Sequence, residues 1–163
     1  MLSKKVEESL NQQIQKEGYS SNLYLAMASW ADTEGYAGIS QWLFAQAEEE
    51  KTHMMKIIHF VNERGGHALI PAYEAPPAKF EGIKKLFNQI LDHERFITKS
   101  INEIVALSIK EDDFATHNWI QWFVTEQIEE ESSVQAILDK LNLLGEKNLY
   151  LFDRDIMGMR GAK

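Results

Sequence analysis

The chain has 163 residues, a formal net charge of −8, 44% hydrophobic and 26% charged residues, and no cysteine. This size suits one globular domain over residues 1–163 without a disulfide scaffold, and the lack of thiols leaves oxygen and imidazole as the metal ligands. The chain is acidic and has no basic stripe, so we expect that it does not bind nucleic acid. It also has no apolar run long enough for a membrane span, so we expect no membrane partner.

The first predicted helix covers residues about 4–33, where apolar residues recur at helical spacing. The opening segment, Met1 to Glu8, turns acidic before any apolar run develops, so we expect no secretory signal and a cytoplasmic location. Glu17 interrupts the apolar stripe of this helix near its midpoint, and Tyr24 follows on the same stripe. A carboxylate at that place is the first candidate metal ligand.

The second predicted helix covers residues about 38–64 and ends at a glycine pair. Glu50 interrupts its apolar stripe near the midpoint, and His53 follows three residues later on the same face. A Glu-x-x-His pair on one helical face offers a carboxylate and an imidazole to one metal ion. The pair is therefore a candidate metal-binding motif.

All three prolines of the chain fall in residues 66–81, which carry no helical pattern. About fifteen residues are enough to run the length of a helix bundle, so the helices on either side of this segment are predicted to lie parallel. The neighbouring links are short and favour antiparallel pairs. One long crossover of this kind is typical of the ferritin-like bundle.

Three further helices are predicted, over residues about 82–110, 113–144 and 148–156. Glu94 interrupts the apolar stripe of the third helix, while Gln127 and Glu130 interrupt that of the fourth. The predicted fold class is thus all-α: a ferritin-like four-helix bundle with one long crossover between helices two and three, plus a short fifth C-terminal helix.

Glutamates from the four long helices are predicted to meet in one layer, because each lies within about half a turn of mid-helix. Four buried carboxylates would be severely destabilising unless they were neutralised, and no stripe carries a cation at this depth. Two divalent metal ions would balance the charge, and oxygen ligands with one imidazole suit iron, manganese or zinc. A single helical glutamate is more often a solvated surface residue, but four at one depth favour a metal centre.

The motifs resemble those of bacterial non-haem ferritins in identity, order and spacing, over essentially the whole chain. The resemblance rests on Glu17, Tyr24, the segment Glu50 to His53, Glu94 and the segment Gln127 to Glu130. It implies that the metal is iron, that the chain is a ferroxidase which oxidises ferrous iron with oxygen or peroxide, and that ferric mineral is stored. It also implies a hollow homo-oligomeric shell of 24 subunits, with the fifth helix around the four-fold axes.

The resemblance implies a role for each candidate residue. The first iron would be bound by Glu17, Glu50 and His53, with Glu50 bridging to a second iron at Glu94 and Glu130. Gln127 would lie beside the second iron and the oxygen species, and Tyr24 close to the same centre. A third iron would bind near the inner surface at three further acids, Glu49, Glu126 and Glu129. The alternative interpretation of these three residues is a solvated acidic face.

Two differences between this sequence and related families reduce the number of functions that fit it. Bacterioferritins and many di-iron oxygenases carry a second Glu-x-x-His on the fourth helix, where this chain has Gln127 and Glu130. That difference favours a transit site, which passes iron to a mineral, over a fixed enzymatic cofactor site. Lys51 stands where bacterioferritins have their haem-ligating methionine, so no haem is expected.

The leading hypothesis is therefore an iron-storage subunit with a dinuclear ferroxidase centre. One alternative is a stand-alone di-iron oxidase or peroxidase that acts on small substrates. Another is a metal-free helical interaction protein, in which the glutamate layer would be solvated. Miniferritins that protect DNA are a weaker match, because they place ligands across subunit interfaces and lack a fifth helix.

Overall fold

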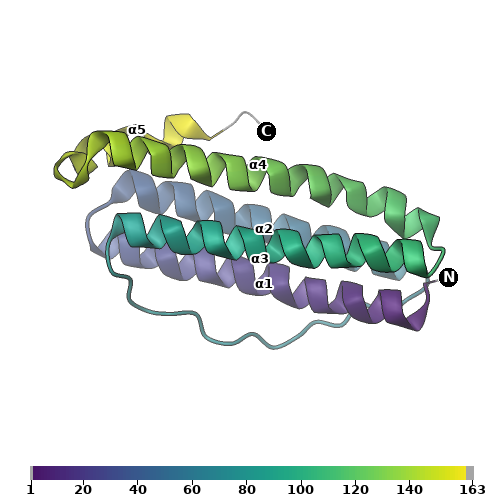
Figure 1. The fold of residues 1–163 in the computed structure, drawn as a ribbon. Helices are drawn as coiled ribbons and strands as arrows, with labels where there is room; N and C mark the ends of the chain where they lie inside the picture. The colour runs from purple at the N-terminus through teal and green to yellow at the C-terminus, as the bar shows by residue number, and fades with distance from the viewer. Residues whose placement is uncertain (1, 161–163) are drawn as a thin grey trace.

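Four long helices make up most of the protein, which is described over residues 2–160 by a computed structural model (Figure 1). The helices are α1 (Lys4–Thr33), α2 (Ala37–Glu63), α3 (Ile83–Lys110), α4 (Phe114–Leu144) and α5 (Leu149–Asp155), with 3-10 turns η1 (Glu146–Asn148) and η2 (Ile156–Met159) on either side of α5. No strand occurs among these described residues, and the predicted all-α bundle is confirmed. None of the described helices is both long and apolar enough to cross a membrane.

The helices begin and end within one residue of the predicted ranges. Most of the differences fall on cap residues, because apolar periodicity does not separate a cap from the helix that it flanks. Asp113 caps α4, where its carboxylate accepts a hydrogen bond from the backbone N–H of Thr116 at 3.0 Å. The same carboxylate accepts a bond from Arg64 at 3.0 Å. The C-terminal end of α2 is thereby tied to the start of α4.

The connections between helices set their directions. Short links join α1 to α2 and α3 to α4, whereas the segment between α2 and α3 runs along one side of the bundle from end to end (Figure 1). The backbone N–H of Leu69 fixes this segment to α1 through Asn11 Oδ1 at 2.7 Å. Further along, Tyr73 packs so closely over Gly18 that any side chain at Gly18 would collide with its ring. The predicted crossover is therefore present and packed against α1.

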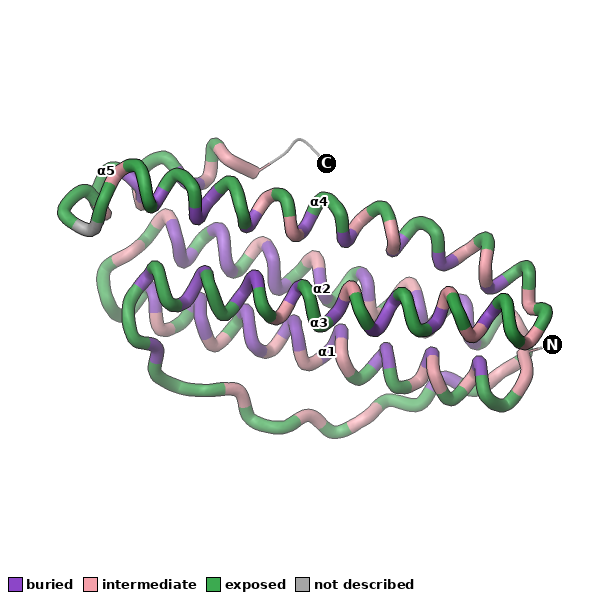
Figure 2. The backbone as a smooth tube through the Cα atoms, in the orientation of Figure 1, coloured by how far each residue is buried: buried purple, intermediate pink, exposed green. Residues whose placement is uncertain are grey.

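The apolar core is divided into two clusters, and every bundle helix passes from one cluster to the other. Figure 2 shows that the buried residues lie on the inward side of each helix. Representative members are Tyr24, Leu43, Phe87 and Val134 in one cluster and Ile14, Ile57, Ile101 and Phe123 in the other. The predicted glutamates fall between the two clusters in all four helices, so a polar layer is enclosed by apolar side chains above and below.

Helix α5 docks on the bundle beside the start of α2. Phe152 is buried and packs edge-on against Phe87, with ring centroids 6.0 Å apart. The backbone N–H of Ile39 donates to Asp153 Oδ1 at 2.8 Å. Gly38 permits this approach, because a Cβ at that position would collide with the backbone carbonyl of Asp153.

Replacing Gly38 with alanine should loosen α5 from the bundle. The added methyl group cannot coexist with the Asp153 carbonyl, so the two helices must separate, at an overpacking cost of about 1–3 kcal/mol. Thermal unfolding followed by circular dichroism should give a lower melting temperature than for the wild type. Gly158→Ala is the matched control, since a Cβ there meets nothing within 4 Å. Equal melting temperatures for the two variants would contradict this account of α5 docking.

Candidate metal centre

The polar layer brings together glutamates from all four bundle helices. Each glutamate lies on the apolar stripe of its helix and is therefore turned into the interior. His53 lies one turn beyond the glutamate of α2 and faces the same way. The exposed fractions are 1% for Glu17, 2% for Glu50, 3% for His53, 1% for Glu94 and 3% for Glu130.

The first candidate metal group consists of Glu17, Glu50 and His53, which offer ligand atoms within 4.8 Å of one another. His53 Nδ1 lies 3.4 Å from Glu50 Oε2 and 4.0 Å from Glu17 Oε2. Glu17 Oε2 and Glu50 Oε1 are buried and have no hydrogen-bond partner. Burying a carboxylate oxygen without a partner costs several kcal/mol. A divalent cation that accepts oxygen and imidazole ligands fits this group.

A second group lies on the other side of the histidine ring and consists of Glu49, His53, Glu126 and Glu130, again with ligand atoms within 4.8 Å of one another. His53 Nε2 lies 3.8 Å from Glu126 Oε1, so the two ring nitrogens face different groups. Two of the three acids predicted for a third iron are therefore brought together. Glu129 is exposed and lies outside the group, because successive residues point about 100° apart around a helix.

Glu94 is held by hydrogen bonds and belongs to neither group among the described residues. The hydroxyl of Tyr24 donates to Glu94 Oε1 at 2.5 Å, and Gln127 Nε2 donates to Glu94 Oε2 at 3.2 Å. Across the layer, Gln46 Nε2 donates to Glu130 Oε2 at 3.0 Å. Tyr24 and Gln127 thus both contact the acid that the resemblance assigns to the second iron.

Apolar periodicity misses two glutamines that support the acids. Gln13 Nε2 donates to Glu17 Oε1 at 2.7 Å, just as Gln46 supports an acid of α4. The hydroxyl of Ser100 donates to Gln13 Oε1 at 2.6 Å. The same hydroxyl oxygen accepts a hydrogen bond from Lys16 Nζ at 2.5 Å. These two hydrogen bonds connect the polar layer with the surface. A sequence signal exists for both glutamines, because each precedes the buried glutamate of its own helix by four residues, about one turn.

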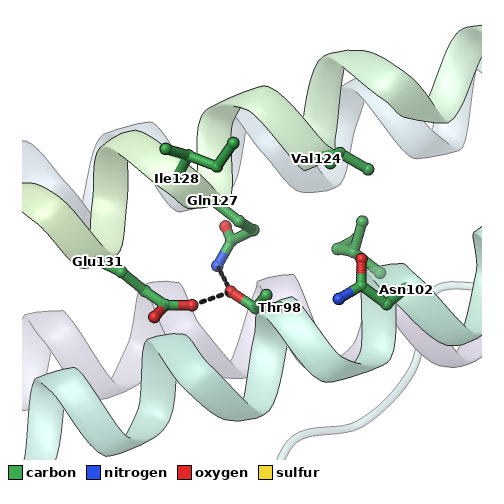
Figure 3. A pocket seen from close by; sticks show the side chains of 7 residues that line it. Thr98, Asn102, Val124, Gln127, Ile128 and Glu131 are labelled. Atoms are coloured by element: carbon green, nitrogen blue, oxygen red, sulfur yellow. Dashed lines mark hydrogen bonds between the residues drawn. The ribbon is translucent and has the colours of Figure 1, made fainter.

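A surface pocket between α3 and α4 reaches the layer at Gln127 (Figure 3). The side-chain nitrogen of Gln127 donates to Thr98 Oγ1 at 3.2 Å as well as to Glu94. The Thr98 hydroxyl in turn donates to Glu131 Oε1 at 2.6 Å at the edge of this pocket. Two side chains therefore connect the buried Glu94 with a half-buried acid near the surface.

Burial raises the pKa values of three carboxyl groups in the layer, those of Glu17, Glu50 and Glu94. Burial, together with the neighbouring charge of Glu50, raises the pKa of Glu17 from an ordinary 4.5 to about 8. Burial and the charges of Glu94 and Glu130 hold the pKa of Glu50 well above its usual range. The pKa of Glu94 is also raised by burial, although the hydrogen bonds that it accepts oppose the rise. Metal binding at neutral pH must therefore displace protons from this layer.

Comparisons with known proteins identify the family. The sequence model of the family Ferritin, described as a ferritin-like domain, matches residues 7–144. A probable bacterial non-heme ferritin-like protein of Haemophilus influenzae is 44% identical over 158 residues, which cover 96% of both chains. A bacterial non-heme ferritin of Campylobacter jejuni is 42% identical over 158 residues, covering 96% of this chain and 95% of that protein.

Solved structures agree with the sequence comparisons. An open pore ferritin from the hyperthermophilic archaeon Archaeoglobus fulgidus matches with a TM-score of 0.93 at 43% identity, covering 96% of this chain and 98% of that one. A humanized archaeal ferritin matches with a TM-score of 0.95 at 41% identity, covering 100% of this chain and 99% of that one. The matched residues 7–144 include both candidate metal groups. The resemblance drawn from the motifs is therefore confirmed, and the chain belongs to the ferritin family.

Proposed function

We propose that this member of the ferritin family is the subunit of a cytoplasmic iron store with ferroxidase activity. Ferrous ions bind in the buried layer, oxygen or peroxide takes electrons from them, and the ferric product moves inward to form a mineral. Iron is the substrate of this reaction. The protein contributes the ligands, the charge balance and the exclusion of water.

The observation that carries this proposal is the pair of unpartnered oxygens on Glu17 and Glu50 beside His53. In the metal-free layer a proton shared between Glu17 and Glu50 serves these oxygens. A cation that takes its place would bind both acids and His53 at once. Two divalent cations would balance the charges of the four buried glutamates. A metal-free interaction protein would instead need this layer to be solvated, and the layer is buried.

The geometry supports two iron positions that share one carboxylate. Glu17, Glu50 and His53 Nδ1 would bind the first iron, since they form one compact group. Glu94 and Glu130, on the other two helices, would bind the second iron, with Glu50 between the two positions. Iron would replace protons at Glu17 and Glu50, whose pKa values are raised, and hydrogen bonds at Glu94 and Glu130.

Tyr24 and Gln127 would position Glu94 for the second iron through the hydrogen bonds that they donate to its two oxygens. Gln127 also lines the pocket between α3 and α4. An oxidant that enters this pocket would therefore reach Gln127 before it reaches the buried acids of the layer. The second group would hold a third iron on its way inward through Glu49 and Glu126, and the exposed Glu129 would extend that path toward the inner surface.

Assembly into a hollow homo-oligomeric shell of 24 subunits is part of the same proposal. Several large apolar side chains are exposed on a single subunit, and contacts between copies in such a shell would cover some of them. They include Ile70, Phe114, Ile128, Leu143 and Tyr150. The relatives found in the comparisons are themselves ferritins, over nearly the same length of chain.

Loading the purified protein with ferrous iron in air tests the proposal. A coloured ferric species should form, and electron microscopy should reveal hollow spheres with dense interiors. A monomer or dimer on size exclusion that turns over without mineral would favour the stand-alone di-iron oxidase or peroxidase. No binding of ferrous iron in anaerobic calorimetry would favour the metal-free interaction protein.

A further inference from the structure

The segment after α5 places one positive charge against the second metal group. Arg160 follows η2, and its Nη2 donates to Glu49 Oε2 at 3.0 Å. The contact is partly shielded from water, with exposed side-chain fractions of 22% for Arg160 and 12% for Glu49. Arginine stays charged at any ordinary pH, so this guanidinium always presents a cation to the acid.

The same guanidinium also holds a residue that supports the metal layer. Arg160 Nη1 donates to Gln46 Oε1 at 2.6 Å. Because the amide oxygen of Gln46 is bound to arginine, its nitrogen is turned the other way, where it donates to Glu130 Oε2 at 3.0 Å. The arginine lies 5.8 Å from the centre of the Trp42 ring, which further fixes its position. Arg160 therefore acts on two acids of the second group, directly on Glu49 and through Gln46 on Glu130.

We propose that Arg160 is a built-in competitor for the cation in the second group, and this proposal rests on the iron-binding function proposed above. A metal ion bound by Glu49 would have to share that carboxylate with the guanidinium or displace it, and the two positive charges repel each other. The competition lowers the affinity of the group for metal. A group made of three carboxylates and an imidazole then holds iron briefly and passes it on, as a transit site must.

The competition has a reciprocal consequence for the C-terminal segment. If Arg160 weakens metal binding at Glu49, then metal binding must weaken the attachment of Arg160 to α2 by the same factor. The arginine is bound to side chains of α2 at both terminal nitrogens. Occupation of the second group is therefore coupled to release of the Arg160 side chain from α2.

Calorimetric titration with Zn²⁺, a redox-inert probe, tests the proposal on the assembled protein. Glu49→Gln identifies the binding step of the second group, because it removes one of that group's carboxylates. In Arg160→Gln this step should tighten about tenfold, the effect of losing one charge-assisted hydrogen bond to a ligand. Arg160→Lys should tighten this step less than Arg160→Gln does, because lysine keeps a positive charge beside Glu49 but cannot hold Glu49 and Gln46 together.

Arg154→Gln is the matched control, because Arg154 pairs with its exposed neighbour Asp155 at 2.8 Å. It removes a C-terminal arginine of α5 and should leave every Zn²⁺ affinity unchanged. Unchanged or weaker binding in Arg160→Gln would overturn the competition, and so would tightening in Arg160→Lys equal to that in Arg160→Gln. Wild-type protein that binds no Zn²⁺ and oxidises no ferrous iron would instead overturn the proposed function itself.

Discussion

Replacing Glu50 with alanine should reduce the rate of iron oxidation by at least about 100-fold, the scale of losing one central electrostatic partner in an active site. Glu50 lies 3.4 Å from His53 and carries one of the two unpartnered buried oxygens. It is also the acid that the two proposed iron positions share. Its removal would therefore weaken both positions at once, whereas loss of Glu17 or Glu94 would weaken one. Stopped-flow absorbance after mixing with ferrous iron in air measures the rate.

Glu48→Ala is the control for the Glu50 variant, because Glu48 lies on the same turn of α2 but faces solvent. It removes the same chemical group and changes helix propensity in the same direction, so it should oxidise iron at the wild-type rate. Both variants should assemble and remain helical by circular dichroism. A Glu50→Ala protein that oxidises iron as fast as Glu48→Ala would remove the physical basis for a ferroxidase centre in this layer.

The fold could be predicted from the sequence because its determinants are periodic. Apolar residues recur once per helical turn, and Glu17 or Glu94 is then recognised as a carboxylate on an otherwise apolar stripe. The length of the segment between α2 and α3 distinguishes a crossover bundle from an up-and-down bundle. Both features can be recognised within one helix or one link, with no knowledge of distant contacts.

Contacts between distant segments could not be predicted in the same way. Arg160 meets Glu49 across 111 positions of the chain, and no helical pattern indicates where a residue after α5 will lie. The orientation of Gln46 depends on a second hydrogen bond of the same arginine, from Nη1 to Gln46 Oε1. Glu129 illustrates the opposite difficulty, since the next residue, Glu130, is a buried ligand candidate while the side chain of Glu129 is exposed to solvent. Spacing places a residue on a helical face, whereas its partners are set by packing.

The metal-free protein should lose stability as the pH rises from about 4.5 to about 8. Burial raises the pKa of Glu17 from 4.5 to about 8, so between these values the folded state keeps a proton that the unfolded chain has released. Folding therefore takes up a proton in this range, and the free energy of unfolding falls as the pH rises. At about 1.4 kcal/mol for each pH unit, the loss is on the order of a few kcal/mol, and Glu17 shares it with Glu50, whose charge contributes to the shift. Glu50 and Glu94, whose pKa values are also raised, act in the same direction.

Denaturant unfolding at pH 5, 6.5 and 8, at one protein concentration and in the presence of a chelator, measures this loss. Glu17→Gln is neutral at every pH and nearly the same size, so it should reduce the slope of stability against pH. Zn²⁺ should reverse the loss, because a metal ion prefers the deprotonated carboxylates and its affinity rises as protons leave. A slope that Glu17→Gln leaves unchanged would mean that Glu17 is already ionised at neutral pH. In that case the layer would have another source of positive charge, and a metal ion would not be needed to balance it.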